Sequence, residues 1–388
     1  MLNSEVQEFL DDNLDGNIPE LLFRGSPFKS IGIQVLVEQI EAKVRCKHKL
    51  PTWFNTSCIY YPNKLNIEQT SSEITAKFKS QLIEGDSIVD LTGGFGVDCY
   101  YFSKRFSTVI HCEINQKLSE IVRHNFQQLQ VQNIKTVSED GLSYIGKAKE
   151  TYDWIYVDPS RRHESKGKVF RLRDCEPNLP EHLEYLFEYS SNILIKTSPM
   201  LDFTIGINEL KNVKSIVVVA VNNEVKELLW ILKKNYNGEI TIQTVNHTKQ
   251  ESQHFDFILD EETKVTPIYD KPLRYLYEPN AAILKSGAFN SVSEALKVNK
   301  LQKHSHLYTS EQILEFPGRR FVIEKVLEYN KKTLKKEGIK KANITTRNFP
   351  ETVNTLRKKF NIRDGGLTYL FFTTDLNEQK LVLVCRKV

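Results

Sequence analysis

Residues 86–98 read DSIVDLTGGFGVD. The run 86–91 is apolar enough for a short buried strand, and residues 97–106, VDCYYFSKRF, are typical of a helix. Between them, Gly93, Gly94 and Gly96 allow a tight turn in which the main chain approaches a ligand without a Cβ in the way. We therefore expect a ligand-binding loop at the carboxyl end of the first strand of an α/β domain.

The alternation of strand and helix continues beyond this loop. Apolar segments that predict further strands occupy residues 107–113, 134–140, 152–159, 192–197, 213–221 and 239–245. Amphipathic segments between them predict helices, for example at 115–130 and 223–235. Because strands that are apolar throughout are buried on both faces, the expected fold class is α/β, with a doubly wound, mostly parallel sheet of seven strands.

Five segments are expected along the chain. Residues 1–65 carry helical patterns, residues 66–245 hold the α/β domain, and residues 246–275 are a polar hairpin or linker. Residues 276–315 are expected to form a small connecting module of ferredoxin-like type, and residues 316–388 a small basic α+β domain.

The net charge of +4 is unevenly distributed. Residues 301–388 contain 18 Lys and Arg against 9 Asp and Glu, whereas residues 1–300 contain 35 against 40. A basic segment beside a slightly acidic body is the pattern expected of a protein that binds a polyanion such as RNA. A solvated basic face without a ligand would give the same count.

The composition also argues against several classes of protein. No apolar run approaches the roughly 18 residues of a membrane span, and the acidic start MLNSEVQEFLDDNLDG is unlike a secretory signal. The six cysteines are scattered without a C-x-x-C pair, so reduced thiols and a cytoplasmic protein are expected. The nine histidines show no ligand spacing, and no metal is expected.

Two classes of cofactor compete for the glycine loop. A dinucleotide requires G-x-G-x-x-G and places its pyrophosphate at the helix N-terminus. This chain reads G-G-F-G-V-D, so the third glycine is missing and Asp98 would repel a diphosphate. S-adenosylmethionine carries a sulfonium, an ammonium group and a carboxylate, and this pattern of charge suits Asp90 at the end of the strand and Asp98 near the loop.

Acidic residues recur at the ends of the predicted strands. Glu113 follows Gly93 by 20 residues, the position at which a carboxylate binds ribose hydroxyls in either cofactor class. Asp140 is placed for an adenine amino group, and Asp158 ends the fourth strand. The residues expected to bind the cofactor are Asp90, Thr92, Gly93, Gly94, Gly96, Asp98, Glu113 and Asp140.

The motifs of the chain carry a family resemblance. The string DLTGGFGVD looks like the D-x-T-x-G-x-G-x-D variant found in several RNA base methyltransferases, and residues 66–245 are similar to the class I methyltransferase fold. With DPSRR at 158–162 and the C-terminal FPGRRF, RNFP and RDGG motifs, the whole chain resembles bacterial class I methyltransferases with a THUMP-like domain. The resemblance implies S-adenosylmethionine as cofactor and an rRNA or tRNA as substrate.

The same resemblance places the methyl acceptor against the loop after the fourth strand, and it implies that Asp158, Pro159, Ser160 and Arg161 are the catalytic residues. Related enzymes that methylate exocyclic amines have Asp/Asn-Pro-Pro-aromatic at this loop, and this chain departs from the pattern at Ser160 and Arg161. Carbon-5 methylation of a pyrimidine needs a thiolate nucleophile. Neither DPSRR nor LIKTSPM contains a cysteine, and the position of Cys175 is open, so a base nitrogen is the expected acceptor.

Basic residues in two parts of the chain are expected to contact the substrate. They are Arg162, Lys196, Arg347, Arg357, Lys358 and Lys359. A run of lysines between Lys331 and Lys341 is expected to neutralise phosphates without reading sequence. Two other functions remain open: an RNA-binding protein with a non-catalytic methyltransferase fold, and an NAD-dependent oxidoreductase.

Overall fold

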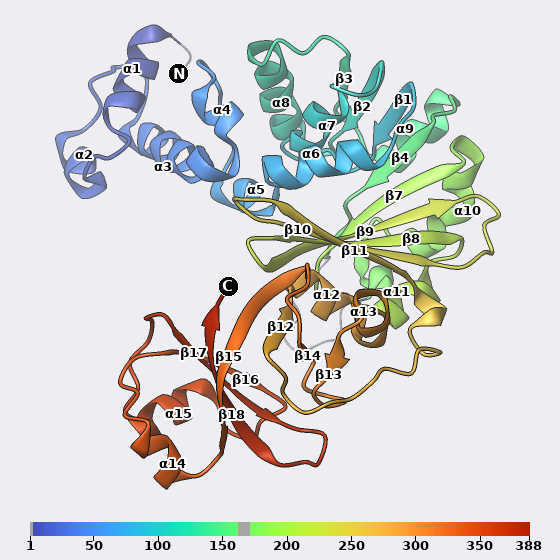
Figure 1. Cartoon of the computed structure of the whole chain (residues 1–388). Helices are drawn as coiled ribbons and strands as arrows, with labels where there is room; N and C mark the ends of the chain where they lie inside the picture. The colour runs from blue at the N-terminus through green and yellow to red at the C-terminus, as the bar shows by residue number, and fades with distance from the viewer. Residues whose placement is uncertain (1–2, 162–170) are drawn as a thin grey trace. The chain divides into compact units, whose positions relative to one another are not determined.

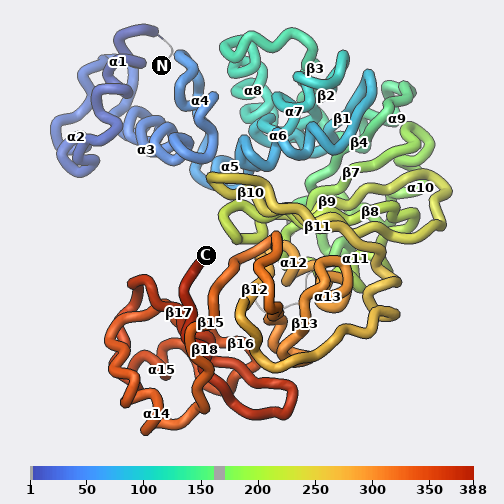
Figure 2. Tube along the Cα trace, viewed as in Figure 1, coloured from blue at the N-terminus to red at the C-terminus, as the bar shows by residue number. Residues whose placement is uncertain are grey.

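The computed structural model describes residues 3–161 and 171–388, which fall into two compact units. Unit 1 comprises Met1–Thr197, Thr204–Asn212 and Trp230–Tyr236, and unit 2 comprises Ser198–Phe203, Val213–Leu229 and Asn237–Val388. Figures 1 and 2 show the elements of both units, coloured along the chain.

The first part of unit 1 is helical. Its helices are α1 (Ser4–Asp12), α2 (Ile18–Arg24), α3 (Ile33–Lys49), α4 (Pro51–Asn55) and α5 (Lys64–Gln69). Val6, Leu10 and Leu36 belong to the small apolar core of this part. Buried amides fasten the segment that follows: Gln39 exchanges two hydrogen bonds with the main chain of Tyr61, and Asn125 does the same with Tyr60.

A parallel sheet forms the rest of unit 1. Its strands, in the order β7-β4-β1-β2-β3, are β7 (Asn192–Thr197), β4 (Trp154–Val157), β1 (Ser87–Asp90), β2 (Thr108–Cys112) and β3 (Ile134–Val137). The helices are α6 (Glu73–Leu82), α7 (Val97–Phe102), α8 (Gln116–Gln128), α9 (Gly141–Ala148), α10 (Leu179–Tyr189) and α11 (Phe203–Glu209). Because the strands run in one direction, their carboxyl ends share one edge of the sheet.

One predicted helix is wrong. Residues 223–235 do not form a helix, because Glu224–Lys233 is strand β9. It follows β8 (Val213–Val221) after only Asn222 and Asn223, both at positive φ, and two such residues make the tight turn of a hairpin. The apolar residues of β9 that suggested one face of a helix are buried as a run instead.

Unit 2 contains two groups of strands. In the first, β11 (Ser252–Ile258), β10 (Thr241–His247), β8 and the beginning of β9 follow in that order, with β10 parallel to β8 and antiparallel to β11, whereas β9 from Trp230 onward belongs to unit 1. The expected arrangement of seven strands is therefore not reproduced, although the mixed α/β class is confirmed. The Asn223 side chain accepts a hydrogen bond from the main chain of Ala281, which ties this group to the C-terminal part of unit 2.

The second group is a sheet in the order β13-β14-β12-β15-β18-β17-β16. The strands are β12 (Tyr275–Pro279), β13 (Asn299–Lys300), β14 (Tyr308–Ser310), β15 (Gly318–Glu328), β16 (Asn343–Arg347), β17 (Thr368–Thr374) and β18 (Lys380–Lys387). The helices are α12 (Ala281–Ser286), α13 (Phe289–Leu296), α14 (Lys331–Lys336) and α15 (Val353–Phe360). A hairpin whose turn lies at Asp375–Glu378 joins β17 to β18. No helix among the described residues is long and apolar enough to cross a membrane.

Candidate functional site

The glycine loop lies where the sequence predicts it, between β1 and α7. Gly93 packs so closely on β2 that a Cβ at this position would collide with the His111 ring. Gly96 caps α7 at φ +78°, a conformation that favours glycine, and a Cβ there would lie 2.6 Å from the Phe126 ring. The two glycines are therefore required by packing as well as by any ligand.

The loop N–H groups are already bonded within the protein. Gly93 donates to the Cys112 carbonyl at 2.7 Å, Gly94 to Glu113 Oε2 at 3.0 Å, and Gly96 to the Gly93 carbonyl at 2.9 Å. A pyrophosphate needs such donors turned toward it. S-adenosylmethionine has no phosphate, so the residues of this loop fit it better than they fit a dinucleotide.

Asp90 ends β1 and is almost completely buried, with 1% of its surface exposed. Its Oδ1 accepts hydrogen bonds from the Thr92 N–H and hydroxyl at 2.9 and 3.2 Å, and the Cys99 thiol donates to Oδ2 at 3.3 Å. Burial raises the pKa of Asp90 to about 7, although the Thr92 N–H opposes the shift. The charge of this acid is therefore expected to change near neutral pH.

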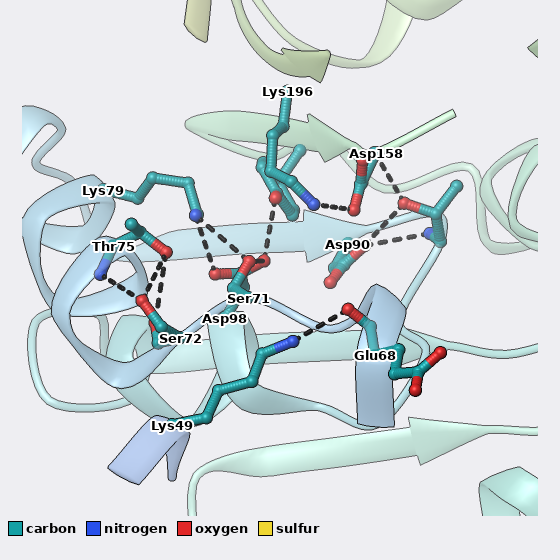
Figure 3. Close-up of polar contacts among 12 residues, drawn as sticks. Lys49, Glu68, Ser71, Ser72, Thr75, Lys79, Asp90, Asp98, Asp158 and Lys196 are labelled. Atoms are coloured by element: carbon teal, nitrogen blue, oxygen red, sulfur yellow. Dashed lines mark hydrogen bonds and ion pairs between the residues drawn. The ribbon is translucent and has the colours of Figure 1, made fainter. Parts of the chain in front are cut away.

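Asp98 is the centre of a buried polar network beneath the loop (Figure 3). Its Oδ1 pairs with the ammonium of the fully buried Lys79 at 3.2 Å, and its Oδ2 accepts from Ser71 and Tyr156 at 2.8 Å each. Burial by itself would raise the pKa of Asp98, but Lys79 and then Lys196 outweigh it, and the pKa lies below its usual value. A cofactor contact of Asp98 stays a prediction, because the protein itself already binds both oxygens.

Glu113 and Asp140 occupy the ends of the next two strands. Glu113 accepts from the N–H groups of Gly94 and Asn115, the latter at 2.7 Å, so its carboxylate lies against the glycine loop. Asp140 is half-exposed and caps α9 by accepting from the Ser143 N–H at 2.8 Å. The structure therefore brings Glu113 to the loop, whereas helix capping alone is enough to explain Asp140.

Sequence reasoning missed one residue beside Glu113. Ile114 exposes 74% of its surface at the same edge of the sheet. The prediction from the sequence did not name this apolar side chain, which lies next to the strand-end carboxylate of Glu113. A single isoleucine just after the acidic strand end was the only signal in the sequence.

Asp158 follows β4 and is joined to the glycine loop through Thr92. The Asp158 N–H donates to Thr92 Oγ1 at 2.7 Å, and that hydroxyl also bonds Asp90. The Asp158 carboxylate forms an ion pair with Lys196, which the sequence analysis expected to contact substrate instead (Figure 3). The structure thus brings together four predicted site residues, Asp90, Thr92, Asp158 and Lys196, at the ends of three neighbouring strands.

Two other predicted catalytic residues, which follow Asp158 in the loop after β4, differ in exposure. Pro159 is buried and Ser160 is exposed, and Ser160–Arg161 forms the short strand β5, which pairs with β6 (Cys175–Glu176). Cys175 is therefore next to this loop in the main chain, but its thiol is buried and donates to the Arg171 carbonyl at 3.5 Å. The Arg161 side chain and the whole of Arg162 lie outside the described residues.

Most of the predicted basic contacts in unit 2 have partners within the protein. Arg347 pairs with the buried Glu278 at 2.9 Å, Arg357 pairs with Asp364, and Lys359 pairs with Glu351 at 3.0 Å. The first pair joins β16 to β12, and the other two pairs are partly exposed. Of the four residues expected in this unit, Lys358 is the one that the structure leaves exposed without a described ion pair.

A second set of basic residues forms no ion pair with another described residue. These residues are exposed on α14 and in the two adjoining loops: Lys331, Lys332, Lys335, Lys336, Lys340, Lys341 and Arg363. The loops lie side by side, because the main chains of Lys341 and Arg363 form a bridge. No group of three or more metal-ligating side chains was found among the described residues.

Comparison with known proteins identifies the family to which the chain belongs. A crystal structure of a proposed methyltransferase from Porphyromonas gingivalis W83 is 33% identical to the chain, covers 99% of it and 98% of its own length, and superimposes with a TM-score of 0.88. The fold is therefore that of a methyltransferase-like α/β protein with C-terminal modules. The chain belongs to the family of class I S-adenosylmethionine-dependent methyltransferases with a C-terminal THUMP-like domain.

Models of two domain families match the C-terminal part of the chain. Residues 275–317 match a ferredoxin-like domain, and residues 318–387 match a THUMP domain-like family. No curated protein matches the chain.

More distant structures share only part of the chain. An rRNA methylase from Streptococcus thermophilus is 14% identical over 42% of this chain and 94% of its own, with a TM-score of 0.31. The M. capricolum protein TrmK, solved with S-adenosylhomocysteine, is 15% identical over 42% of this chain and 68% of its own, with a TM-score of 0.33.

Proposed function

We propose that the protein transfers a methyl group from S-adenosylmethionine to a base nitrogen of an rRNA or tRNA. The observation that carries the proposal is the chain of contacts from Asp90 through Thr92 to Asp158. It joins the glycine loop to an acid at the next strand end. Such a site can hold a cofactor on one side and a methyl acceptor on the other, and proximity then supplies much of the rate.

Each acid has a proposed role toward the cofactor. Glu113 binds the ribose hydroxyls, Asp140 the adenine amino group, and Ile114 covers the adenine ring. Asp90 supplies negative charge below the sulfonium and ammonium groups. S-adenosylmethionine, when bound, supplies an already activated methyl group.

The affinity for S-adenosylmethionine should rise as the pH rises through about 7. Below this pH Asp90 is protonated, and above it the carboxylate attracts the positively charged cofactor, since burial raises its pKa to about 7. The dissociation constant should fall by at most about tenfold per pH unit and then level off. Calorimetry from pH 5.5 to 8.5 measures the effect. Asp90→Asn should bind more weakly and show no such pH dependence; an unchanged pH profile in Asp90→Asn would assign the titration to another group.

RNA is proposed to bind the exposed basic residues of α14 and its adjoining loops. Replacing Lys331, Lys332, Lys335 and Lys336 by glutamine should weaken binding to total RNA and reduce the slope of log affinity against log salt by up to about 0.7 per lost phosphate contact. Filter binding between roughly 50 and 200 mM salt measures both.

A control variant that loses the same number of positive charges shows whether RNA binding depends on this surface or only on the net charge of the protein. Exposed lysines elsewhere in the chain serve for it, namely Lys64, Lys211, Lys226 and Lys264, each replaced by glutamine. If the control weakens RNA binding as much as the α14 variant does, RNA does not bind this surface specifically.

Mass spectrometry of nucleosides from cells with and without the protein tests the proposed reaction. A methylated nucleoside that is missing without the protein identifies the product. A missing 5-methylpyrimidine would replace the nitrogen by a carbon acceptor. Binding of RNA with no methyl transfer would favour the non-catalytic alternative, and binding of NAD without S-adenosylmethionine would favour an oxidoreductase.

A further inference from the structure

Lys196 and Asp158 are neighbours because of the sheet register. Strands β4 and β7 are parallel, and Val157 lies opposite Ile195. The next residues along the two strands are Asp158 and Lys196, so their side chains emerge together at the carboxyl edge. The Lys196 side chain is 12% exposed and that of Asp158 is 33% exposed.

Asp158 is held at two points. Its N–H donates to Thr92 Oγ1 at 2.7 Å, and Lys196 Nζ donates to its Oδ2. No residue that the structure describes donates a hydrogen bond to Oδ1. One carboxylate oxygen is thereby fixed against a cation, in a side chain that is itself one-third exposed.

The geometry points to Lys196 as a positioning residue of the methyl-transfer site, which acts on the acceptor through Asp158 and does not itself contact RNA. This inference rests on the proposed function. Transfer of a methyl group to a base nitrogen that carries a hydrogen leaves S-adenosylhomocysteine and releases that hydrogen as one proton. Asp158 Oδ1 is the atom placed to accept this proton, while the ion pair with Lys196 prevents the carboxylate from turning.

The alternative is that Lys196 binds the RNA directly, and the two roles differ in what they change. A positioning residue affects turnover and leaves both binding steps intact. A phosphate contact raises the apparent KM for RNA and leaves turnover nearly intact. Because the ion pair already occupies the ammonium, the structure favours the first role.

The test uses the full-length chain and total RNA from cells that lack the protein. Lys196→Met should lower kcat by about 100-fold, with the dissociation constants for S-adenosylmethionine and RNA within about threefold of wild type. Lys196→Arg should recover much of the activity, because a guanidinium also pairs with a carboxylate. Lys211→Met, at an exposed ion pair in the same unit, should behave as wild type.

A double variant separates positioning from a general loss of structure. If Lys196 acts only through Asp158, Lys196→Met should cost no further activity in a chain that already carries Asp158→Asn. Weaker RNA binding with unchanged kcat, or wild-type activity of Lys196→Met, would overturn the role of Lys196 alone. If the wild-type chain transfers no methyl group to RNA but binds S-adenosylmethionine, the proposed function fails, and the role of Lys196 fails with it.

Discussion

Replacing Asp158 by alanine should reduce methyl transfer to RNA by at least about 100-fold, the size of effect typical of a lost acid–base group. Affinity for S-adenosylmethionine should stay within about threefold of wild type, because Asp158 bonds the glycine loop through its main-chain N–H, which the substitution retains. Transfer of tritiated methyl groups and calorimetry measure the two quantities on the same preparations.

Asp86→Ala is the matched control for this experiment. Both variants replace an aspartate by alanine, so the change of charge is the same. Asp86 is exposed just before β1, at the opposite end of that strand from the site. It should transfer methyl groups as wild type does. If Asp158→Ala also keeps wild-type activity, the loop after β4 is not the reacting centre; if it loses the cofactor instead, Asp158 belongs to the cofactor site.

Replacing Lys79 by methionine should lower the free energy of unfolding by about 3–5 kcal/mol, because it removes one partner of a buried ion pair and leaves the other without its cation. Lys79 is fully buried, and the Asp98 side chain is only 11% exposed, so solvent can compensate little for the lost cation. Urea unfolding followed by circular dichroism measures the change. Lys77→Met, an exposed position on the same helix, should change stability by no more than about 0.5 kcal/mol.

The effect of Lys79→Met should depend on pH. The pKa of Asp98 is lowered in the folded protein, so its contribution to stability is present above the ordinary value of 3.8 and is lost as the pH falls through the folded pKa. The difference between wild type and Lys79→Met should therefore shrink toward acid pH. Asp98→Asn combined with Lys79→Met should cost less than the two single changes added together; strict additivity would mean that the pair is not coupled.

The sequence alone was enough to locate the glycine loop between β1 and α7. Glycines between a strand and a helix form a local signal for a tight turn, although the packing of Gly93 on His111 and of Gly96 on Phe126 is evident only from the structure. Glu113 could also be placed, because parallel strands bring their carboxyl ends to one edge. The prediction of a helix at residues 223–235 was wrong for a local reason as well. The apolar pattern is compatible with a helix or a strand, and the hairpin turn at Asn222 and Asn223 was not taken into account.

What each polar side chain does was decided only by the tertiary structure. The sequence shows Lys196, Arg347 and Lys358 as similar cations, yet the first pairs with Asp158, the second with the buried Glu278, and the third is exposed. Lys79 on α6 likewise pairs with Asp98 on α7, a contact that the sequence around either residue does not indicate. Hydrophobic periodicity and backbone conformation depend on a few neighbouring residues, so they can be predicted from the sequence. Ion pairing joins side chains far apart in sequence, and whether a charge meets a partner or solvent depends on how the elements pack.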